Sequence, residues 1–346
     1  MKLKELSDLL GLSPTTVSRA LNGYPEVSEA TRERVMRVAA KQNYRPNRRA
    51  MGLATGRAMA IGHIIPVSSK HELVNPVFAE FIAGASQTYN GQGYELMLSF
   101  ADSEDEAEIY RSVVAKGAVD GVILHSPKRE DPRVNLLQEI GIPFVIHGRV
   151  SERVQDYSWI DVNNRSAFYQ ATRLLLDLGH RRIALINGLE TLDFAWNRRK
   201  GYEQALHEAG IELDPTLLGT AGLTETHGYT STARLLEMEN PPTALLASSY
   251  VVGLGASRAI REAGLTMGKE VSVIIHDDEL SYFHNVGDVP LFTSTRSSVR
   301  EAGIKAAQML LELIEGKTTG PVSQLLESHL TIGSSTGPCT LREKIT

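Results

Sequence analysis

The stretch LKELSDLLGLSPTTVSRALNGYPEVSEATRERVMRVAAKQNYRPNRRAMGLATG, residues 3–56, decides how this chain is organised. One helical stripe carries its first leucines, Leu3, Leu6, Leu9 and Leu10. Gly11 then interrupts the helix, and glycine suits the left-handed turn that such a break needs. Ser13 is a good N-cap, and Pro14 follows at the first helical position, where its missing N–H does no harm. The pattern therefore predicts a second helix from Pro14 to about Leu21.

A third helix is predicted from Glu29 to about Gln42, with Ser28 as its N-cap. Three short helices with a tight glycine turn between the first two are typical of a helix-turn-helix. The alternative is a helical bundle that only caps a larger domain. The outer face of the second helix is polar and basic, with no apolar stripe left for docking, which favours DNA binding.

The second helix of such a motif lies in the major groove of double-stranded DNA, with its N-terminal residues at the base edges. Thr15 and Thr16 offer hydroxyl and methyl groups, and Arg19 can donate to guanine or to a phosphate. Phosphate contacts that set the register are predicted for four more residues, Ser13, Ser18, Asn22 and Tyr24.

Composition indicates a basic head on an acidic body. Residues 1–60 contain eleven Lys and Arg against five Asp and Glu, although the chain of 346 residues carries a net charge of −5. This length predicts two or three domains, and the asymmetry suggests that only the head meets a polyanion.

The remaining composition excludes several protein classes. No apolar run reaches the roughly 18 residues of a membrane helix, and the N-terminus lacks a signal-peptide core. The single cysteine, Cys339, excludes an internal disulfide and a cysteine-based zinc site. We therefore expect a cytoplasmic protein with no cofactor, no metal and no membrane partner.

The quoted stretch resembles the headpiece of the LacI family of bacterial transcription regulators over residues 2–58. TVSRALN, VSEATRERV and NYRPN carry the resemblance. It implies that Pro14, Thr15 and Arg19 occupy the base-reading positions. Proline departs from the pattern because it has no side-chain donor, so readout at Pro14 must be apolar or absent.

Residues 47–54 resemble the hinge helix of that family. The resemblance implies that this segment folds on operator DNA and that Leu53 wedges into the central base step, which kinks the duplex. A short segment containing Gly52 is a marginal helix by itself, which fits folding on DNA. The DNA-binding set therefore includes Asn47, Leu53 and Ala54, with a headpiece at 1–46 and a hinge at 47–58.

From Ala60 onward, short apolar runs alternate with helical stretches. The runs are 61–67, 94–100, 119–125, 144–147, 183–187, 243–247 and 271–276. Such alternation predicts doubly wound parallel sheets, and there are too many strands for one sheet. The fold class is thus an all-α helix-turn-helix headpiece plus an α/β two-lobed domain.

Residues 60–335 resemble the periplasmic-binding-protein-like core of LacI-family regulators. This implies three crossings between lobes, which we expect near Val162, Thr293 and Gln324. The ligand-binding and dimerisation domain then spans 59–340, with a first lobe of about 59–162 and 293–323 and a second of about 163–292 and 324–340.

Ligands of open α/β sheets bind at the carboxyl ends of strands, in the crevice between lobes. The predicted effector-binding residues are Ser68, Phe78, His125, His147, Arg149, Phe194, Trp196, Arg198, Ser248 and Asp277. Donors and acceptors for hydroxyl groups, together with aromatic rings for stacking, suit a sugar. The resemblance marks Arg198, Asp277 and His125, whereas Trp196 is chosen for stacking.

Each of these residues also has a structural interpretation. Asp277 or Asp278 can cap a helix, His125 and His147 can be ordinary strand-end histidines, and Trp196 can belong to the core. A metal site at 276–278 is disfavoured because adjacent residues of a strand point apart.

The sequence thus predicts a homodimeric repressor of sugar-utilisation genes that binds a pseudo-palindromic operator. Small residues at the lining suggest a roomy pocket for a disaccharide, and within the family the sequence is similar to α-glucoside-utilisation regulators. We expect the dimer seam near residues 77–89 and 111–116, and no leucine heptad follows Gly333 to make a tetramer.

Three alternatives remain. One is a corepressor-dependent or global regulator that binds a non-sugar metabolite. More remote are a sugar-binding transport protein and an enzyme acting in the cleft, for which no catalytic residues are predicted.

Overall fold

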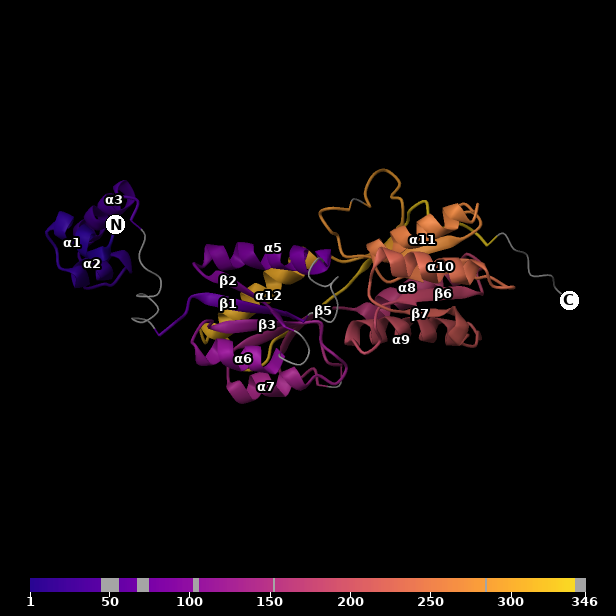
Figure 1. The fold of residues 1–346 in the computed structure, drawn as a ribbon, viewed down its shortest axis with the longest axis horizontal. Helices are drawn as coiled ribbons and strands as arrows, with labels where there is room; N and C mark the ends of the chain where they lie inside the picture. Colours follow the sequence, from indigo (N-terminus) through magenta and orange to yellow (C-terminus); the bar gives the residue numbers. More distant parts are fainter. Residues whose placement is uncertain (45–55, 67–74, 102–105, 152, 284, 340–346) are drawn as a thin grey trace. The chain divides into compact units, whose positions relative to one another are not determined.

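The computed structural model describes residues 1–44, 56–66, 75–101, 106–151, 153–283 and 285–339. The chain divides into two units, Met1–Met59 and Ala60–Thr346, which are drawn in Figure 1. Four predicted site residues lie outside the described residues: Asn47, Leu53, Ala54 and Ser68.

The first unit contains the three expected short helices, α1 (Leu3–Leu10), α2 (Pro14–Leu21) and α3 (Glu29–Lys41). Gly11 ends α1 with a φ of 65°, in the left-handed region that favours glycine. Ser13 caps α2, because its Oγ accepts a 3.1 Å hydrogen bond from the backbone N–H of Thr16. The helices enclose one small core of Leu6, Leu10, Val17, Ala20, Val27, Val35 and Ala39.

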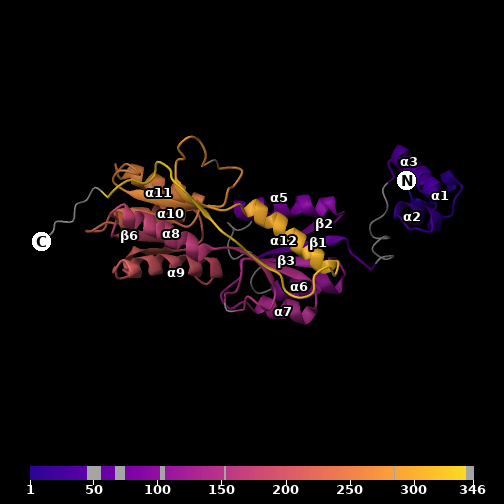
Figure 2. The same cartoon turned by 180° about the vertical axis from the view of Figure 1, so that it is seen from behind.

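The second unit begins with a parallel sheet in the order β11-β5-β4-β3-β1-β2. Its strands are β1 (Ala60–Pro66), β2 (Glu95–Ala101), β3 (Gly121–His125), β4 (Phe144–His147), β5 (Ser158–Val162) and β11 (Ser323–Leu326). Helices α5 (Pro76–Gly91) and α12 (Val299–Ile314) pack together on one face. Helices α6 (Glu106–Ala115) and α7 (Pro132–Ile140) cover the other face (Figures 1 and 2). We call this the first lobe.

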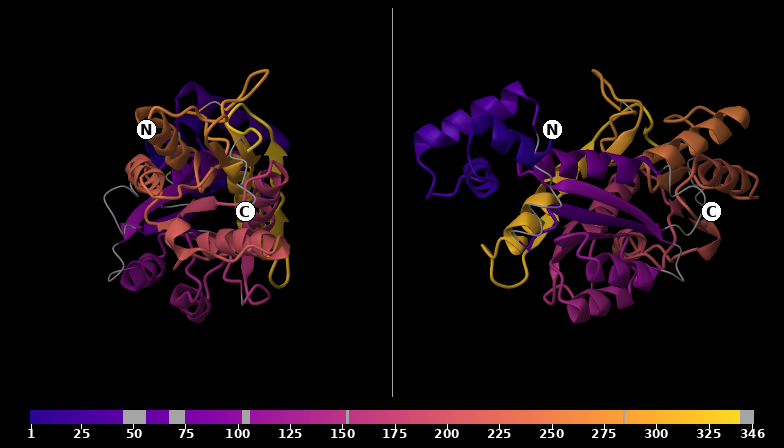
Figure 3. Two further views of the ribbon diagram at one scale, coloured as in Figure 1. Left: turned by 90° about the vertical axis from the view of Figure 1, so that its right-hand side faces the viewer. Right: turned by 60° about the vertical axis from the view of Figure 1, so that its left-hand side comes forward.

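The second lobe is built on a sheet in the order β12-β10-β9-β8-β6-β7, parallel except for β12. Its strands are β6 (Ile183–Asn187), β7 (Leu218–Thr220), β8 (Ala244–Ala247), β9 (Ser272–Asp277), β10 (Thr293–Arg296) and β12 (His329–Thr331). The helix pair α8 (Asn164–Asp177) and α9 (Asp193–Glu208) packs on one face (Figure 3). The pair α10 (Glu225–Leu236) and α11 (Tyr250–Glu262) packs on the other, and Pro215–Leu217 forms a 3-10 turn.

The chain crosses between the lobes three times. The first crossing follows Val162, the point expected from the sequence. The crossings predicted near Thr293 and Gln324 need correction, because β10 completes the second-lobe sheet to Arg296 and β11 completes the first-lobe sheet to Leu326. The chain therefore crosses after these strands. Polar β10 (TSTR) has no apolar run that would have marked it as a strand.

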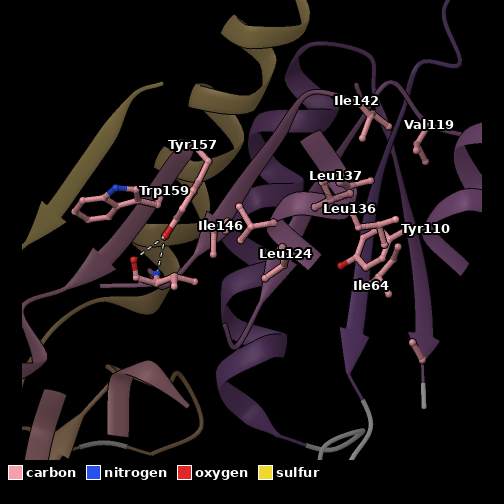
Figure 4. Packing of buried hydrophobic residues seen from close by; sticks show 14 residues of the cluster. Ile64, Tyr110, Val119, Leu124, Leu136, Leu137, Ile142, Ile146, Tyr157 and Trp159 are labelled. Carbon is pink, nitrogen blue, oxygen red and sulfur yellow. Dashed lines mark hydrogen bonds between the residues drawn. The ribbon is translucent and has the colours of Figure 1, made fainter. Parts of the chain in front are cut away.

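The first-lobe core fixes the strand ends that approach the ligand crevice. Ile64 pairs in register with Leu124, and Leu124 with Ile146, and all three pack toward α6 and α7 (Figure 4). Because side chains alternate along a strand, the next residues, His125 and His147, turn to the opposite face and lie side by side. Among the described residues, no helix combines the length and apolar character that a membrane span requires.

Candidate functional site

The predicted DNA-reading residues lie on the surface of the first unit. Ser13, Pro14, Thr15, Arg19, Asn22 and Tyr24 are exposed, whereas Thr16 and Ser18 are partly exposed. Arg19 makes no hydrogen bond or ion pair with another described residue, so its guanidinium is available to a partner. A shallow groove beside it is lined mainly by hydroxyl groups, those of Ser13, Thr15, Thr16, Ser28 and Thr31.

The loop after α2 is held in place by Arg32. Its guanidinium forms a 2.9 Å ion pair with Glu29 and donates to the carbonyl oxygens of Gly23 and Tyr24. Arg34 donates to the carbonyl of Leu10, at the end of α1. These arginines are committed to the fold, in contrast to Arg19.

A cavity of about 120 Å³ lies between the two lobes of the second unit. Its polar lining comes from Asn75, Ser126, His147, Asp161, Asn164, Arg198, His276, Asp278 and Ser297. Its apolar walls come from Val77, Phe78, Pro127, Ile160, Val162, Phe194, Leu223, Val299 and Ala302. Four predicted effector residues, Phe78, His147, Phe194 and Arg198, line it.

Arg198 is the central cation of the cavity. The side chain is buried, its Nε donates to Asn164 Oδ1 at 2.7 Å, and its Nη1 donates to the carbonyl of Ser248 at 2.5 Å. Its guanidinium also lies 4.9 Å from the centre of the Phe194 ring. Nη2 has no acceptor among the described residues. Burial lowers the pKa of Arg198 to about 10, against the opposing pull of Asp278 and Asp161, so it stays charged at neutral pH.

Asp278, rather than the predicted Asp277, lines the cavity. Side chains alternate along a strand, and His276 in β9 and Asp278 directly after it line the cavity, whereas Asp277 between them does not. The carboxylate of Asp277 instead accepts the N–H of Glu279 at 2.9 Å and lies 3.6 Å from Arg296.

The charge of Asp278 balances that of Arg198. Burial alone would raise the pKa of Asp278, but the charge interaction with His276, the hydrogen bond from His276 and the charge of Arg198 lower it below its usual value. Arg198 and Asp278 therefore give the lining one cation and one anion.

Asp161 supplies a third ionisable group. Burial raises its pKa to about 7, and Arg149, whose Nε lies 3.1 Å from Oδ2, opposes that rise. This ion pair holds the predicted residue Arg149 away from the lining. The side-chain amide of Asn164 also donates to Asp161, at 3.3 Å.

The lobes touch through contacts that each join a helix of one lobe to a loop of the other. The carboxylate of Asp193, in α9, accepts bonds from the backbone N–H of Ser151 at 3.1 Å and from its hydroxyl at 2.9 Å. Asn197 donates to the same carboxylate at 2.6 Å. On the opposite side, Glu80 of α5 accepts bonds from the backbone and hydroxyl of Ser281.

Trp196 belongs to this contact between the lobes and not to the cavity lining. Two cations lie over its ring, Arg129 at 4.0 Å and Lys200 at 4.4 Å from the ring centre. Arg129 comes from the first lobe, so the stacking expected with a sugar is replaced by a cation–π contact that bridges the lobes.

The other predicted residues lie just behind the lining. His125 is fully buried and contacts His147, with 3.2 Å between their Nδ1 atoms. Ser248 is also buried; its hydroxyl donates to Asn187 and its carbonyl accepts from Arg198.

Several lining residues were not selected from the sequence. They are Asn75, Ser126, Asp161, Asn164, His276, Asp278 and Ser297. Their position at the end of a predicted strand could have identified Ser126 and His276 as lining residues. Asp278 could have been identified because it lies two residues after His276, on the same side of the chain. Asp161 and Asn164 lie on either side of the first crossing between the lobes. Two polar residues around a predicted crossing could have identified both as lining residues. Among the described residues, no group of three His, Cys, Asp or Glu side chains could hold a metal ion.

Comparison with known proteins matches both units. A family model described as "Bacterial regulatory proteins, lacI family" matches residues 2–47. One described as "Periplasmic binding proteins and sugar binding domain of LacI family" matches residues 58–331. HTH-type transcriptional regulator AglR of Rhizobium meliloti (strain 1021) is 44% identical over 346 residues, 100% of this chain and 97% of that protein.

Two solved structures extend the comparison to the fold. A transcriptional regulator CelR-cellobiose complex has a TM-score of 0.73 and 32% identity, covering 97% of this chain and 99% of that one. The lac repressor dimer bound to operator and the anti-inducer ONPF has a TM-score of 0.82 and 25% identity, with the same coverage of 97% and 99%.

Proposed function

Because the chain belongs to the LacI family of bacterial regulatory proteins, we propose that it represses sugar-utilisation genes under the control of a small sugar bound between its lobes. In this function α2 of each headpiece enters the major groove of a pseudo-palindromic operator. Thr15, Thr16 and Arg19 meet the base edges, and the surrounding hydroxyl groups meet phosphates. Regulation of this kind takes place in the cytoplasm, where the operator lies.

The observation that carries the effector proposal is the balanced polar lining of the cavity. Arg198 and Asp278 offset each other in charge, which favours a neutral ligand over an anionic metabolite. Neutral ligands rich in hydroxyl groups satisfy both donors and acceptors of such a lining, and Phe78 and Phe194 offer apolar faces to a sugar ring.

The proposed mechanism couples effector binding in the cavity to the affinity of the headpieces for DNA. A ligand shifts DNA affinity only by its differential affinity for two conformations, typically about 1–3 kcal/mol. Contacts between the lobes, such as Ser151–Asp193 and Glu80–Ser281, exist only when the lobes are together. We propose that effector binding changes the relation of the lobes and thereby the separation of the two hinge segments at 47–58 in a dimer.

A homodimer fits both the operator and the surface of the first lobe. A pseudo-palindrome needs two headpieces. The edge strand β2 exposes Leu98 and Phe100, and exposed apolar side chains on an edge strand favour burial against a second copy. We extend the seam predicted at residues 77–89 and 111–116 to this strand.

A thermal-shift screen of neutral sugars tests the effector class. Maltose, sucrose and trehalose represent α-glucosides, which the sequence resemblance favours, and cellobiose is the β-linked comparison. The hit is then titrated against the operator complex, and we expect it to weaken DNA binding. A hit that leaves DNA affinity unchanged contradicts linkage, whereas one that strengthens it establishes the corepressor alternative. Turnover of the sugar would revive the enzyme alternative.

A further inference from the structure

A line of hydrogen bonds runs inside the first lobe from a buried tyrosine to the cavity. Tyr89 Oη lies 3.0 Å from His63 Nε2, and His63 Nδ1 lies 3.1 Å from His125 Nε2. His125 Nδ1 lies 3.2 Å from His147 Nδ1. Tyr89, His63 and His125 are fully buried, whereas His147 lines the cavity. We call these four residues the histidine line.

Each histidine of the line is neutral at physiological pH. Burial, followed by the proximity of His147, lowers the pKa of His63 to about 3. Burial also lowers the pKa of His147 to about 4, although the charge of Asp278 opposes this, and it lowers that of His125 well below 6.5. A neutral imidazole has one N–H and one acceptor nitrogen, so each ring donates at one end and accepts at the other.

Only two arrangements of protons satisfy all three hydrogen bonds. In the first, Tyr89 donates to His63, His63 to His125 and His125 to His147, which leaves His147 with its proton on Nε2. In the second, every bond runs the other way, so His147 Nε2 carries a lone pair and Tyr89 accepts from His63. The two arrangements offer the cavity opposite chemistry from the same ring.

Tyr89 distinguishes the two arrangements. When it donates to His63, its hydroxyl hydrogen is satisfied. When it accepts, that hydrogen needs another acceptor, and no other described residue provides one. A buried donor without a partner is costly, so the first arrangement is favoured.

The aromatic surroundings keep the rings from rotating out of the line. The ring of Phe81 stacks on His147 with centres 4.1 Å apart and an angle of 23°, and it meets His125 edge-on at 5.1 Å and 83°. A flip of the His147 ring would place the carbon Cδ2 where Nδ1 now faces His125, and so would break that hydrogen bond. Because packing holds the rings in place, the arrangement of protons decides whether His147 Nε2 is a hydrogen-bond donor or an acceptor.

We propose that Tyr89 is a positioning residue for effector recognition: through His63 and His125 it makes His147 a hydrogen-bond donor to the ligand. The site then selects a sugar with an acceptor oxygen, such as a ring or glycosidic oxygen, opposite His147 Nε2. The identity of the ligand rests on the proposed function, but the direction of the hydrogen bonds does not.

Nitrogen NMR of the full-length, ligand-free protein with ¹⁵N-labelled histidine tests the arrangement directly. Protonated and unprotonated ring nitrogens give well-separated signals. We expect protons on Nδ1 of His63, Nδ1 of His125 and Nε2 of His147. The reverse pattern, or a doubly protonated His147 at neutral pH, overturns the proposal. This measurement needs no effector and no variant.

A double-mutant cycle tests the effect on binding of the sugar found in the thermal-shift screen. We expect Tyr89→Phe to weaken its affinity about fivefold in the wild-type background and less than about twofold in His147→Gln, because the glutamine amide carries its own donor. Tyr110→Phe is the control, since Tyr110 is a buried tyrosine of the same lobe whose hydroxyl has no hydrogen-bond partner among the described residues.

Equal losses in both backgrounds would show a merely structural role for Tyr89 and overturn the proposal, as would an equal loss in Tyr110→Phe. If no sugar binds at all, the proposed function fails, and the NMR pattern still decides the direction of the line. The two failures are therefore distinguishable.

Discussion

The hydroxyl of Ser151 in the first lobe donates a 2.9 Å hydrogen bond to the carboxylate of Asp193 in the second. Asp193 is buried, and burial raises its pKa even though both bonds from Ser151 oppose the rise. The contact exists only when the two lobes meet. Its strength therefore contributes to the balance between open and closed forms of the ligand domain.

Removing this hydroxyl should favour the open form. Ser151→Ala loses the hydrogen bond that the hydroxyl donates to Asp193 and the one that it accepts from Asn197 at 3.0 Å. The net loss is about 1 kcal/mol, because Asn197 keeps its bonds to Asp193 and the backbone bond of Ser151 at 3.1 Å remains. If the effector binds the closed form, its affinity should fall about fivefold. Calorimetric titration measures this. Ser166→Ala is the control, because its hydroxyl bonds only to Gln170 within α8. If both variants bind the effector as tightly as wild type, the contact between the lobes does not contribute to effector binding and the prediction is wrong.

The neighbours Asp277 and Asp278 make a matched pair for the ligand site. Asp278→Asn removes a cavity carboxylate and should weaken effector binding by about 2 kcal/mol, or about 30-fold. Asp277→Asn should change effector affinity less than about twofold, because its carboxylate points to Glu279 and Arg296. The reverse order in calorimetric titrations would mean that the family resemblance, which marks Asp277, locates the ligand better than the geometry does.

This pair also shows how far the sequence predicts the site. Local signals were sufficient for the headpiece, where Ser13, Pro14 and Gly11 specify the helix ends by capping and backbone geometry. They also predicted the buried strands and two sheets. The choice between Asp277 and Asp278 needed the register of β9, which a run of adjacent polar residues does not reveal.

Other parts of the site depend on distant contacts. Trp196 is aromatic and near the cavity, but Arg129, from the other lobe, occupies its face. Asp161 lines the cavity because β5 ends there, and β5 was missed since its SWIDV sequence mixes polar and apolar residues. Polar strands such as β10 are stabilised by pairing with neighbouring strands of the sheet, which their own sequence does not reveal.

Acid should destabilise the ligand domain through the histidine line. The folded-state pKa values of His63 and His147 are about 3 and about 4, whereas the unfolded chain titrates near 6.5. As pH falls below 6.5 the unfolded state takes up protons first, so the free energy of unfolding decreases until the folded-state pKa is reached. Between pH 6.5 and 5 each histidine that stays neutral in the folded state can lower the free energy of unfolding by up to about 2 kcal/mol.

Thermal unfolding at pH 7 and pH 5 measures this loss. His147→Gln removes one of the titrating groups, so the decrease in its midpoint between the two pH values should be smaller than in wild type. An equal decrease in both proteins would mean that His147 is solvated in the folded state.

Arg19 should contribute to sequence discrimination by the headpiece. Because its guanidinium is exposed and makes no hydrogen bond or ion pair with another described residue, Arg19→Ala should leave stability unchanged. Loss of one bidentate base contact should weaken operator binding by about 1–3 kcal/mol and relax the preference at one base pair. Gel-shift titrations against operator variants measure both effects. Arg261→Ala, an exposed arginine of the ligand domain, controls for the loss of one charge. A uniform loss across all sequences would assign Arg19 to a phosphate instead.

Leu53 tests whether the hinge deforms DNA. It lies outside the described residues, so the prediction rests on the resemblance of residues 47–54 to a hinge helix. Leu53→Ala shortens the proposed wedge and should weaken specific operator binding by a few kcal/mol, on the order of the energy of bending a duplex. Effector affinity of the DNA-free protein should stay the same, because the cavity is built from the other unit. Met51→Ala, in the same segment, controls for general loss of apolar surface. A bend angle and operator affinity equal to wild type in Leu53→Ala would exclude the wedge and leave 47–58 as a simple linker.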